Sequence, residues 1–389
     1  MPSCEPSAPR AARHHALRAG TRSIDINRRP IRCAVQLPVN GFESESTVSR
    51  SSPHVAIVGA TGAVGQEFLA VLAQRDFPIG RLTLLASPRS AGTTCTFRGE
   101  TLTIQALGVD SFEGVDLALF SAGGSISREF APIAVRSGAV VVDNSSAFRM
   151  TEGVPLIVPE VNPQAMSGVS YSNPGIIANP NCSTIIMLMA VTPLHRAVGV
   201  KRMVVSTYQA ASGAGAAAMR ELETQTREVL AGKSAAELTQ DVFHRQYAFN
   251  LFSHDSPMQP NGYNQEELKM VKETAKIWER EIPITATCIR VPVMRAHAES
   301  INLSLGRSLG EDEARALLTA APGVTVLDDR ASNRFPEPLD ASGRDDVYVG
   351  RIRQDISQPD GTGLDLFACG DQIRKGAALN AVQIAELLR

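Results

Sequence analysis

Short apolar runs recur along the first half of the chain, and each is flanked by glycine, proline or polar residues. Runs of four or five apolar residues without alternation are typical of strands buried on both faces, as in a parallel sheet. Helical or loop segments separate the earlier runs. The pattern therefore predicts an α/β fold with a doubly wound parallel sheet, whose strands we expect at 55–58, 82–86, 102–106, 116–120, 139–143 and 156–158.

The second half of the chain predicts a mixed α+β arrangement. "KRMVVSTYQAASGAG" reads as a strand that ends in a loop of small residues, and "NQEELKMVKETAKIWERE" reads as a long charged helix. "ITATCIRVPVMRAHAESINLSLG" predicts two strands joined by a short polar turn, and the chain closes with a helix. We therefore expect a nucleotide-binding domain at 54–180, a second domain at 181–368, and a C-terminal helix at 369–389 that packs back on the first domain.

The first 53 residues differ from the rest. They hold eight arginines, no lysine and four acids, with scattered Ser, Pro and Ala and no apolar periodicity. This composition is typical of an organellar targeting peptide, and "IRCA" at 31–34 resembles the loose consensus around plastid processing sites. A disordered tail or an over-long gene model is the alternative. We expect import into the plastid stroma if the leader is a transit peptide, and a cytoplasmic protein otherwise.

Composition excludes several classes of protein. The net charge of -2 argues against a nucleic-acid partner, which would need a concentrated positive surface. The apolar run 185–191 is far shorter than the roughly 20 residues that cross a bilayer. The six cysteines contain no C-x-x-C pair, and His244 and His254 have no partners at ligand spacing, so neither a disulfide framework nor a metal site is expected. A serine hydrolase would need a G-x-S-x-G elbow.

The first predicted strand runs into "GATGAVG" and then into an amphipathic helix. Gly59, Gly62 and Gly65 permit a tight turn, after which the free amides of the helix can face a pyrophosphate. This is the arrangement of Rossmann-like nucleotide-binding domains. Simple packing of helix against sheet is the alternative interpretation of the same glycines.

The end of the second predicted strand favours NADP over NAD. An NAD site normally carries an acid there, which would repel a 2'-phosphate. Here the strand runs into "ASPRSAG", so Ser87, Arg89 and Ser90 offer two hydroxyls and a cation. The alternative is a solvated arginine in a turn.

Cys182 lies between the proline turn "ANP" and an apolar run that reads as a helix. A helix N-terminus lowers the pKa of a thiol, and a thiolate is a strong nucleophile. Alone, such a cysteine is more often buried and inert. Beside a nicotinamide domain, it has the chemistry of a phosphorylating aldehyde dehydrogenase.

From His54 to Arg389 the chain resembles the aspartate-semialdehyde dehydrogenase family. The resemblance is carried, in the family's order, by "GATGAVG", "ASPRSAG", "DNSSAFRM", "IIANPNCSTI", "STYQAASGAG", "EELKMVKETAKI", "RVPVMRAHAESIN" and "DQIRKGAALNA". Thr93 departs from the pattern, since many members have lysine there. The resemblance implies NADP as cofactor, a catalytic and dimerisation role for the second domain, and a homodimer or homotetramer.

The resemblance also assigns roles to residues. Cys182 matches the nucleophile, His297 the acid-base residue that takes the thiol proton and protonates the departing oxygen, and Gln209 the amide that orients the acyl group. The matched substrate ligands are Arg290 for the α-carboxylate, Glu266 for the amine, Arg149 and Lys269 for phosphate, and Asn181 beside the nucleophile. The matched cofactor residues are Gly59, Thr61, Gly62, Ala63, Val64, Gly65, Ser87, Arg89, Ser90, Ser212, Gly213 and Gln372.

Each role has a structural alternative. A lone histidine at a strand turn is often idle, a strand-end glutamine can be a plain amide, and Glu266 with Lys269 can be a solvated ion pair within one helix. For the whole chain, the resemblance implies NADPH-dependent reduction of L-aspartyl 4-phosphate to L-aspartate 4-semialdehyde. The alternatives are N-acetyl-gamma-glutamyl-phosphate reductase and a catalytically silent nucleotide-binding protein.

Overall fold

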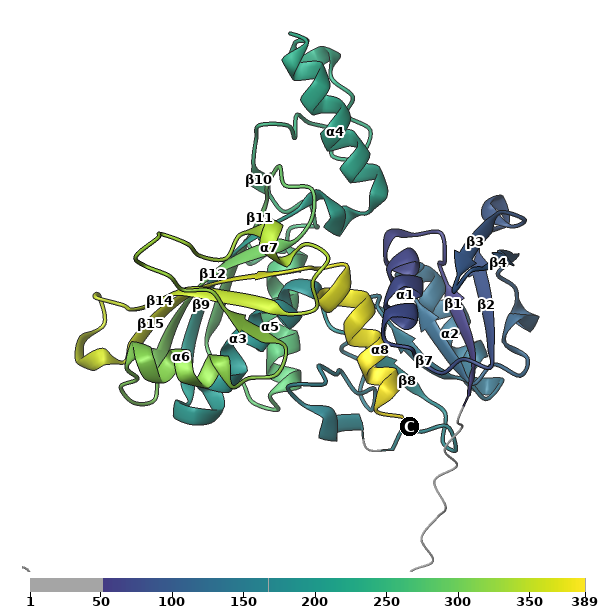
Figure 1. Ribbon diagram of the computed structural model, residues 1–389, viewed down its shortest axis with the longest axis horizontal. Coiled ribbons are helices and arrows are strands. Elements are labelled where there is room, and N and C mark those ends of the chain that lie inside the picture. Colours follow the sequence, from purple (N-terminus) through teal and green to yellow (C-terminus); the bar gives the residue numbers. More distant parts are fainter. Residues whose placement is uncertain (1–51, 167, 389) are drawn as a thin grey trace, which may run out of the picture. The chain divides into compact units, whose positions relative to one another are not determined.

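The computed structural model describes residues 52–166 and 168–388, and these residues belong to one compact unit. Residues 1–51 of the expected leader lie outside the described residues. Two large sheets carry the described chain, with helices packed against them (Figure 1). Within this part of the chain, none of the helices combines the length and the apolar character needed to cross a membrane.

The first sheet is parallel throughout, which confirms the predicted α/β fold class. Its strand order is β5-β2-β1-β6-β7-β8, and its apolar residues face helices on both sides. Helix α1 (Ala63–Gln74) packs on one face and α2 (Gly124–Arg136) on the other. The strands are β1 (His54–Val58), β2 (Arg81–Ala86), β5 (Gln105–Ala106), β6 (Leu117–Phe120), β7 (Val140–Asp143) and β8 (Ile176–Ala178).

Two of the expected strands differ from the structure. The run 102–106 is divided: Leu102 and Thr103 belong to β4 (Glu100–Thr103), which forms an antiparallel ribbon with β3 (Thr94–Phe97), and only Gln105 and Ala106, as β5, join the sheet. The run 156–158 makes only an isolated bridge from Leu156 to Ala178. Proline at 155 and 159 supplies no amide hydrogen to extend a ladder, so the sixth strand is β8 instead.

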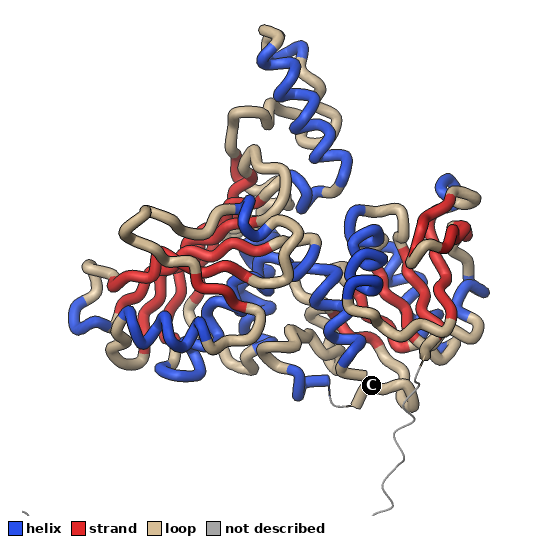
Figure 2. Tube along the Cα trace, viewed as in Figure 1, coloured by secondary structure: helices blue, strands red, loops and turns tan. Residues whose placement is uncertain are grey.

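The second sheet has seven strands in the order β10-β11-β9-β12-β15-β14-β13. Three helices pack on one of its faces: α3 (Cys182–Val198), α5 (Gln265–Ile277) and α6 (Glu311–Thr319). Figure 2 shows this layer of helices beside the strands. The strands are β9 (Val200–Gln209), β10 (Phe252–Ser253), β11 (Ile284–Arg290), β12 (His297–Leu305), β13 (Val324–Val326), β14 (Val347–Gln354) and β15 (Gly363–Gly370).

The expected pair of strands at 284–306 exists, but the two strands are not neighbours. β9 lies between β11, which is parallel to it, and β12, which is antiparallel to it. The six-residue connection 291–296 therefore crosses the end of β9 instead of forming a hairpin turn. As a result the ends of β9 and β11 and the start of β12 meet at one edge, where Gln209, Arg290 and His297 lie.

The C-terminal segment runs from the second sheet to the first. Cys369 and Gly370 still belong to β15, and helical structure begins with a π-helical turn at Arg374–Ala378 that continues as α8 (Leu379–Glu386). Leu379, Val382 and Ile384 of α8 are buried in the core that β1 shares with α1.

Two further α-helices belong to the described part of the chain. α4 (Ala216–Leu230) stands away from both sheets in Figure 1, and its apolar residues pack on Phe243, Tyr247 and Phe252. α7 (Pro338–Ala341) is a single turn before β14.

A buried ion pair fixes the C-terminal segment in place. Lys375 is 1% exposed, and its ammonium donates hydrogen bonds to Glu160 Oε2 (2.7 Å), Gln383 Oε1 (2.7 Å) and Asn380 Oδ1 (3.0 Å). By contrast, Arg75 is 31% exposed where it pairs with Glu386 (2.7 Å) on the same side of the fold. Loss of the lysine would leave Glu160 buried without its cation, which is more costly than loss of a surface pair.

We predict that Lys375→Met lowers the free energy of unfolding by about 3 kcal/mol or more, because the substitution keeps the apolar stem but leaves a buried carboxylate unpaired. Arg75→Ala, the matched control, should cost less than about 1 kcal/mol. Urea unfolding followed by far-UV circular dichroism measures both values. Equal costs would show that the Lys375 pair has no special part in stability.

Candidate active site

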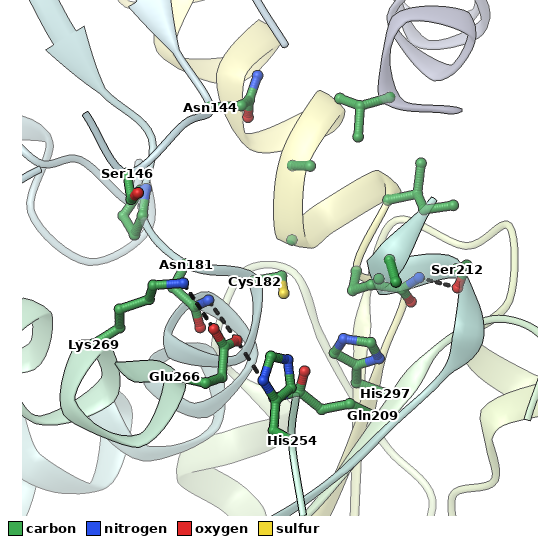
Figure 3. A pocket seen from close by; sticks show the side chains of 18 of the residues that line it. Asn144, Ser146, Asn181, Cys182, Gln209, Ser212, His254, Glu266, Lys269 and His297 are labelled. Atoms are coloured by element: carbon green, nitrogen blue, oxygen red, sulfur yellow. Dashed lines mark hydrogen bonds and ion pairs between the residues drawn. The ribbon is translucent and has the colours of Figure 1, made fainter. Parts of the chain in front are cut away.

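A cavity of about 390 Å³ opens where the two sheets approach each other (Figure 3). Its walls come from the start of α3, the loop after β7, the ends of β9 and β11, the start of β12, and the segment before α8. All eight residues that the sequence predicts for catalysis and substrate binding line it: Arg149, Asn181, Cys182, Gln209, Glu266, Lys269, Arg290 and His297.

Cys182 is the first residue of α3, and Asn181 caps the helix. The Asn181 side chain accepts hydrogen bonds from the amides of Ser183 (3.1 Å) and Thr184 (3.2 Å), so these amides are already partnered. Burial raises the pKa of the Cys182 thiol to about 12, the Glu266 carboxylate adds to the rise, and Arg149 and Lys269 oppose it. The expectation of a lowered pKa is therefore wrong for the free pocket, because desolvation outweighs the helix terminus.

Gly376 packs directly against Cys182. A Cβ atom added there would lie 2.8 Å from the Cys182 Cβ, closer than real side chains approach. Sequence reasoning missed this residue, although a glycine inside a helical pattern is a signal for close packing. The π-helical turn that contains Gly376 thus forms the wall of the cavity behind the sulfur.

His297 is buried and neutral. The amide of Ala210 donates to its Nδ1 (3.0 Å), so the proton of the neutral ring is on Nε2, and Nε2 has no hydrogen-bond partner among the described residues. Burial, together with the positive charge of Arg290, lowers the pKa of His297 to about 3. This arrangement disfavours acceptance of the thiol proton, and it leaves Nε2–H free to donate a hydrogen bond to an oxygen of a ligand.

Gln209 ends β9 and is buried beneath the cavity. Its amide nitrogen approaches the hydroxyl of Ser183 (3.1 Å), the hydroxyl of Thr207 (3.2 Å) and Glu266 Oε1 (3.4 Å). The amide has two hydrogens for these three acceptors. It is therefore held firmly between α3 and α5.

Each cation of the cavity that was predicted to bind an anion is paired with an acid. The three ion pairs have N···O distances of 2.8 to 3.0 Å, and they are Arg149 with Glu273, Lys269 with Glu266, and Arg290 with Asp255. Burial alone would raise the pKa of the Glu266 carboxyl. Lys269 and other neighbours nevertheless hold that pKa far below its ordinary value. The pocket therefore has nearly balanced charge before any ligand enters.

Glu273 is a further residue of this site that sequence reasoning missed. Its Oε1 accepts from Arg149 (3.0 Å), and its Oε2 accepts from the amide of Asn181 (2.6 Å). Arg149 also donates to the carbonyl groups of Asn179 (2.9 Å) and Asn144 (2.8 Å). The signal in the sequence is the spacing, since Glu273 follows Glu266 by seven residues and shares its helix face.

His254 and Asp255 also lie in the cavity, although no pattern in the sequence predicted that they would. The Arg290 guanidinium contacts His254 Nε2 and Asp255 Oδ1, each at 2.8 Å, and donates to the carbonyl of Ala210 (3.3 Å). No group of His, Cys, Asp or Glu within residues 52–166 and 168–388 is arranged to hold a metal ion.

The glycine turn follows β1, and it suits both interpretations of the sequence. A Cβ at Gly59 would lie 2.3 Å from the Ser121 carbonyl oxygen, and one at Gly65 would lie 2.2 Å from that of Gly59. Packing alone thus requires two of the glycines. In addition, Gly62 caps α1 without any side-chain hydrogen bond, so the amides of the first turn remain available to a pyrophosphate.

The other predicted cofactor residues form two groups. Thr61 and Ala63 belong to the turn, and Ser87, Arg89 and Ser90 follow β2 at the same carboxyl edge of the parallel sheet. Four line the cavity itself, at the side toward the turn: Val64, Ser212, Gly213 and Gln372. Gln372 donates to the Ser212 hydroxyl and accepts from the amide of Ala296 (2.9 Å). The two groups together fit a dinucleotide that extends from the sheet edge into the cavity.

We predict that Cys182 of the ligand-free protein reacts slowly with iodoacetamide near neutral pH, because burial keeps its thiol protonated. Below its pKa, the alkylation rate should rise about tenfold for each pH unit, without a plateau between about pH 7 and pH 10. Peptide mass spectrometry of Cys182 against pH measures this rate, with the partly exposed Cys95 as an internal reference. A plateau below about pH 9 would contradict the raised pKa.

The chain was compared with known proteins. Residues 54–169 match the family model "Semialdehyde dehydrogenase, NAD binding domain", and residues 191–375 match "Semialdehyde dehydrogenase, dimerisation domain". The aspartate-semialdehyde dehydrogenase of Synechocystis sp. is 57% identical over 335 residues, which cover 86% of this chain and 96% of that protein. That of Bacillus subtilis is 48% identical over 343 residues, covering 86% and 97%.

Comparison with solved structures gives the same result as comparison with known sequences. The crystal structure of aspartate semialdehyde dehydrogenase II from Vibrio cholerae, complexed with ASA, is 44% identical and has a TM-score of 0.82, over 87% of this chain and 98% of that one. The Candida albicans enzyme with NADP is 25% identical, with a TM-score of 0.63. These relatives favour neither the reductase alternative nor the catalytically silent one. The chain belongs to the aspartate-semialdehyde dehydrogenase family.

Proposed function

We propose that this protein reduces L-aspartyl 4-phosphate with NADPH to L-aspartate 4-semialdehyde and phosphate. The observation that carries the proposal is one cavity that holds a cysteine at a helix start, a neutral histidine with a free Nε2–H, and three paired cations. The names of the relatives support it. The product would supply lysine, through diaminopimelate, and threonine, methionine and isoleucine synthesis.

Cys182 begins the reaction. Its sulfur attacks the acyl carbon of the substrate, a C–S bond forms, and the C–O bond to phosphate breaks, while the thiol proton passes to the departing phosphate, which leaves as hydrogen phosphate. Arg149 and Lys269 hold the departing phosphate, because both line the cavity and the positive charges of both act on the Cys182 thiol. Gln209, fixed by Ser183 and Thr207, orients the thioester.

NADPH, when bound, supplies the hydride that reduces the thioester. His297 donates an Nε2–H hydrogen bond to the oxygen on which negative charge develops, since that hydrogen has no partner among the described residues. The C=O bond then re-forms as the C–S bond breaks, which releases the aldehyde and leaves a Cys182 thiolate that takes up a proton from solvent. Arg290 holds the α-carboxylate throughout, and Glu266 attracts the ammonium group.

The cofactor assignment includes a preference for NADP over NAD. Arg89 is exposed just after β2, in a turn with Ser87 and Ser90, and it makes no ion pair among the described residues. A 2'-phosphate that extends from the glycine turn toward β2 would meet this guanidinium. An NAD ribose would gain nothing from it.

The assembly and the location are also proposals. We assign residues 191–375 to a homodimer or homotetramer contact, because they match a dimerisation domain. We assign residues 1–53 to plastid import on their arginine-rich, lysine-free composition, and the match to the NAD-binding model starts only at residue 54. The boundaries 54–180, 181–368 and 369–389 divide the remainder into nucleotide-binding, catalytic and C-terminal parts.

We predict that the purified protein reduces NADP, with a gain of absorbance at 340 nm, when aspartate semialdehyde and phosphate are supplied. Cys182→Ser should lose nearly all turnover because a serine hydroxyl is a poor nucleophile without a strong base. His297→Asn should slow the reaction about 100-fold or more. No reaction by folded wild-type protein would contradict the proposed function, and an active Cys182→Ser variant would contradict the covalent step.

We also predict that Arg89→Ala weakens NADP binding about tenfold or more and NAD binding little, because a charge-assisted contact to the 2'-phosphate is lost. Fluorescence titration with each cofactor gives the two dissociation constants. Arg81→Ala, at the exposed opposite end of β2, is the matched control. Equal weakening of both cofactors by Arg89→Ala would show that Arg89 supports the turn only.

A further inference from the structure

Asp255 is an acid of the cavity to which no role has been given above. It follows β10, lines the cavity, and places its Oδ1 2.8 Å from the NH2 nitrogen of Arg290. The Asp255 side chain is 42% exposed, whereas that of Arg290 is 3% exposed. The carboxylate therefore lies at the open side of a buried guanidinium, where a ligand can reach it.

Glu266, the acid assigned to the substrate ammonium, is already occupied. Its side chain is 5% exposed. Its Oε1 accepts from Asn181 (2.8 Å) and approaches the Gln209 amide (3.4 Å), while its Oε2 accepts from Lys269 (2.9 Å). An incoming ammonium would have to share or displace these donors. Asp255 has no comparable set of donors.

In an α-amino acid, the groups that bind the carboxylate and the groups that bind the ammonium must lie close together. Its carboxylate and its ammonium are attached to the same carbon, so a carboxylate held by Arg290 brings an ammonium within a few ångströms of the groups that Arg290 touches. Asp255 touches Arg290 directly, and Glu266 is tied to Lys269 instead. An arginine and a neighbouring acid together offer an opposite charge to the carboxylate and to the ammonium of such a head group.

We propose that Asp255 binds the α-ammonium of the substrate, so that Arg290 and Asp255 together recognise its amino-acid head group. This inference rests on the proposed function. Asp255 is then a determinant of specificity: it favours a semialdehyde with a free amine over one that has none. Glu266, which lines the same cavity next to Lys269, also attracts this ammonium group.

Two other roles would fit the same contact, and they predict different kinetics. If Asp255 only positioned Arg290, its loss would weaken every substrate that carries the carboxylate. If Asp255 only competed for Arg290, its loss would strengthen every such substrate. Only recognition of the ammonium makes the effect of losing Asp255 depend on whether the substrate carries an amine.

The test compares aspartate semialdehyde with its des-amino analogue, 4-oxobutanoate, in wild-type protein and in Asp255→Asn. The variant should raise the KM for aspartate semialdehyde about tenfold or more, with kcat within about twofold, because a charge-assisted contact is lost. The KM for 4-oxobutanoate, or its inhibition constant where turnover is too slow, should stay unchanged or fall. Asp312→Asn, at an exposed acid that pairs with Arg315 outside the cavity, should change neither value.

A parallel loss with both compounds, a parallel gain with both, or no change with either would overturn the proposal. The variant keeps the shape of the side chain, and the unchanged inhibition by 4-oxobutanoate would report that Arg290 is still in place. The outcome is separate from that of the proposed function. A wild-type enzyme without activity toward aspartate semialdehyde refutes the proposed function. An active wild type whose Asp255→Asn variant has the same selectivity between the two compounds refutes only the role of Asp255.

Discussion

The carboxylate of Glu273 joins two of the segments that form the cavity around Cys182. One of its oxygens receives the guanidinium of Arg149, from the loop after β7, and the other receives the amide of Asn181, which caps the helix that Cys182 begins. Burial raises the pKa of Glu273, and these two donors oppose the rise by stabilising the charged form. A single side chain of α5 thus connects the loop after β7 of the nucleotide-binding sheet, through Arg149, with the start of the helix that carries Cys182.

The balance of charge in the cavity follows from the same constraint. Buried cations are costly without partners, so Arg149, Lys269 and Arg290 each hold an acid while the pocket is free. Substrate then brings charges of both signs into a site that already contains both. Binding becomes an exchange of partners, which lets the site discriminate by the arrangement of charges and not by net charge alone.

Local signals allowed much of this to be read from the sequence. The glycine turn, the apolar runs and the helix start at Cys182 depend on neighbours in the chain, and the family motifs supplied the expected roles of Cys182 and His297. Three features depended on distant contacts and were missed. The pKa of Cys182 is governed by burial, the partners of Arg290 come from a loop 35 residues away, and β9 inserts between two strands that are adjacent in sequence. Proline at 155 and 159, although local, was not weighed against the apolar run between them.

The path of residues 369–388 has a consequence for how the protein folds. Residues of α8 complete the core of the first sheet, and Gly376 closes the wall behind Cys182, although the whole second sheet lies between these residues and the first sheet in the sequence. Contacts between segments so far apart in the sequence require the closure of a long loop, which slows their formation. Until α8 docks, the nucleotide-binding sheet has part of one face uncovered. Completion of that core and closure of the cavity are therefore one event, because the same segment supplies both.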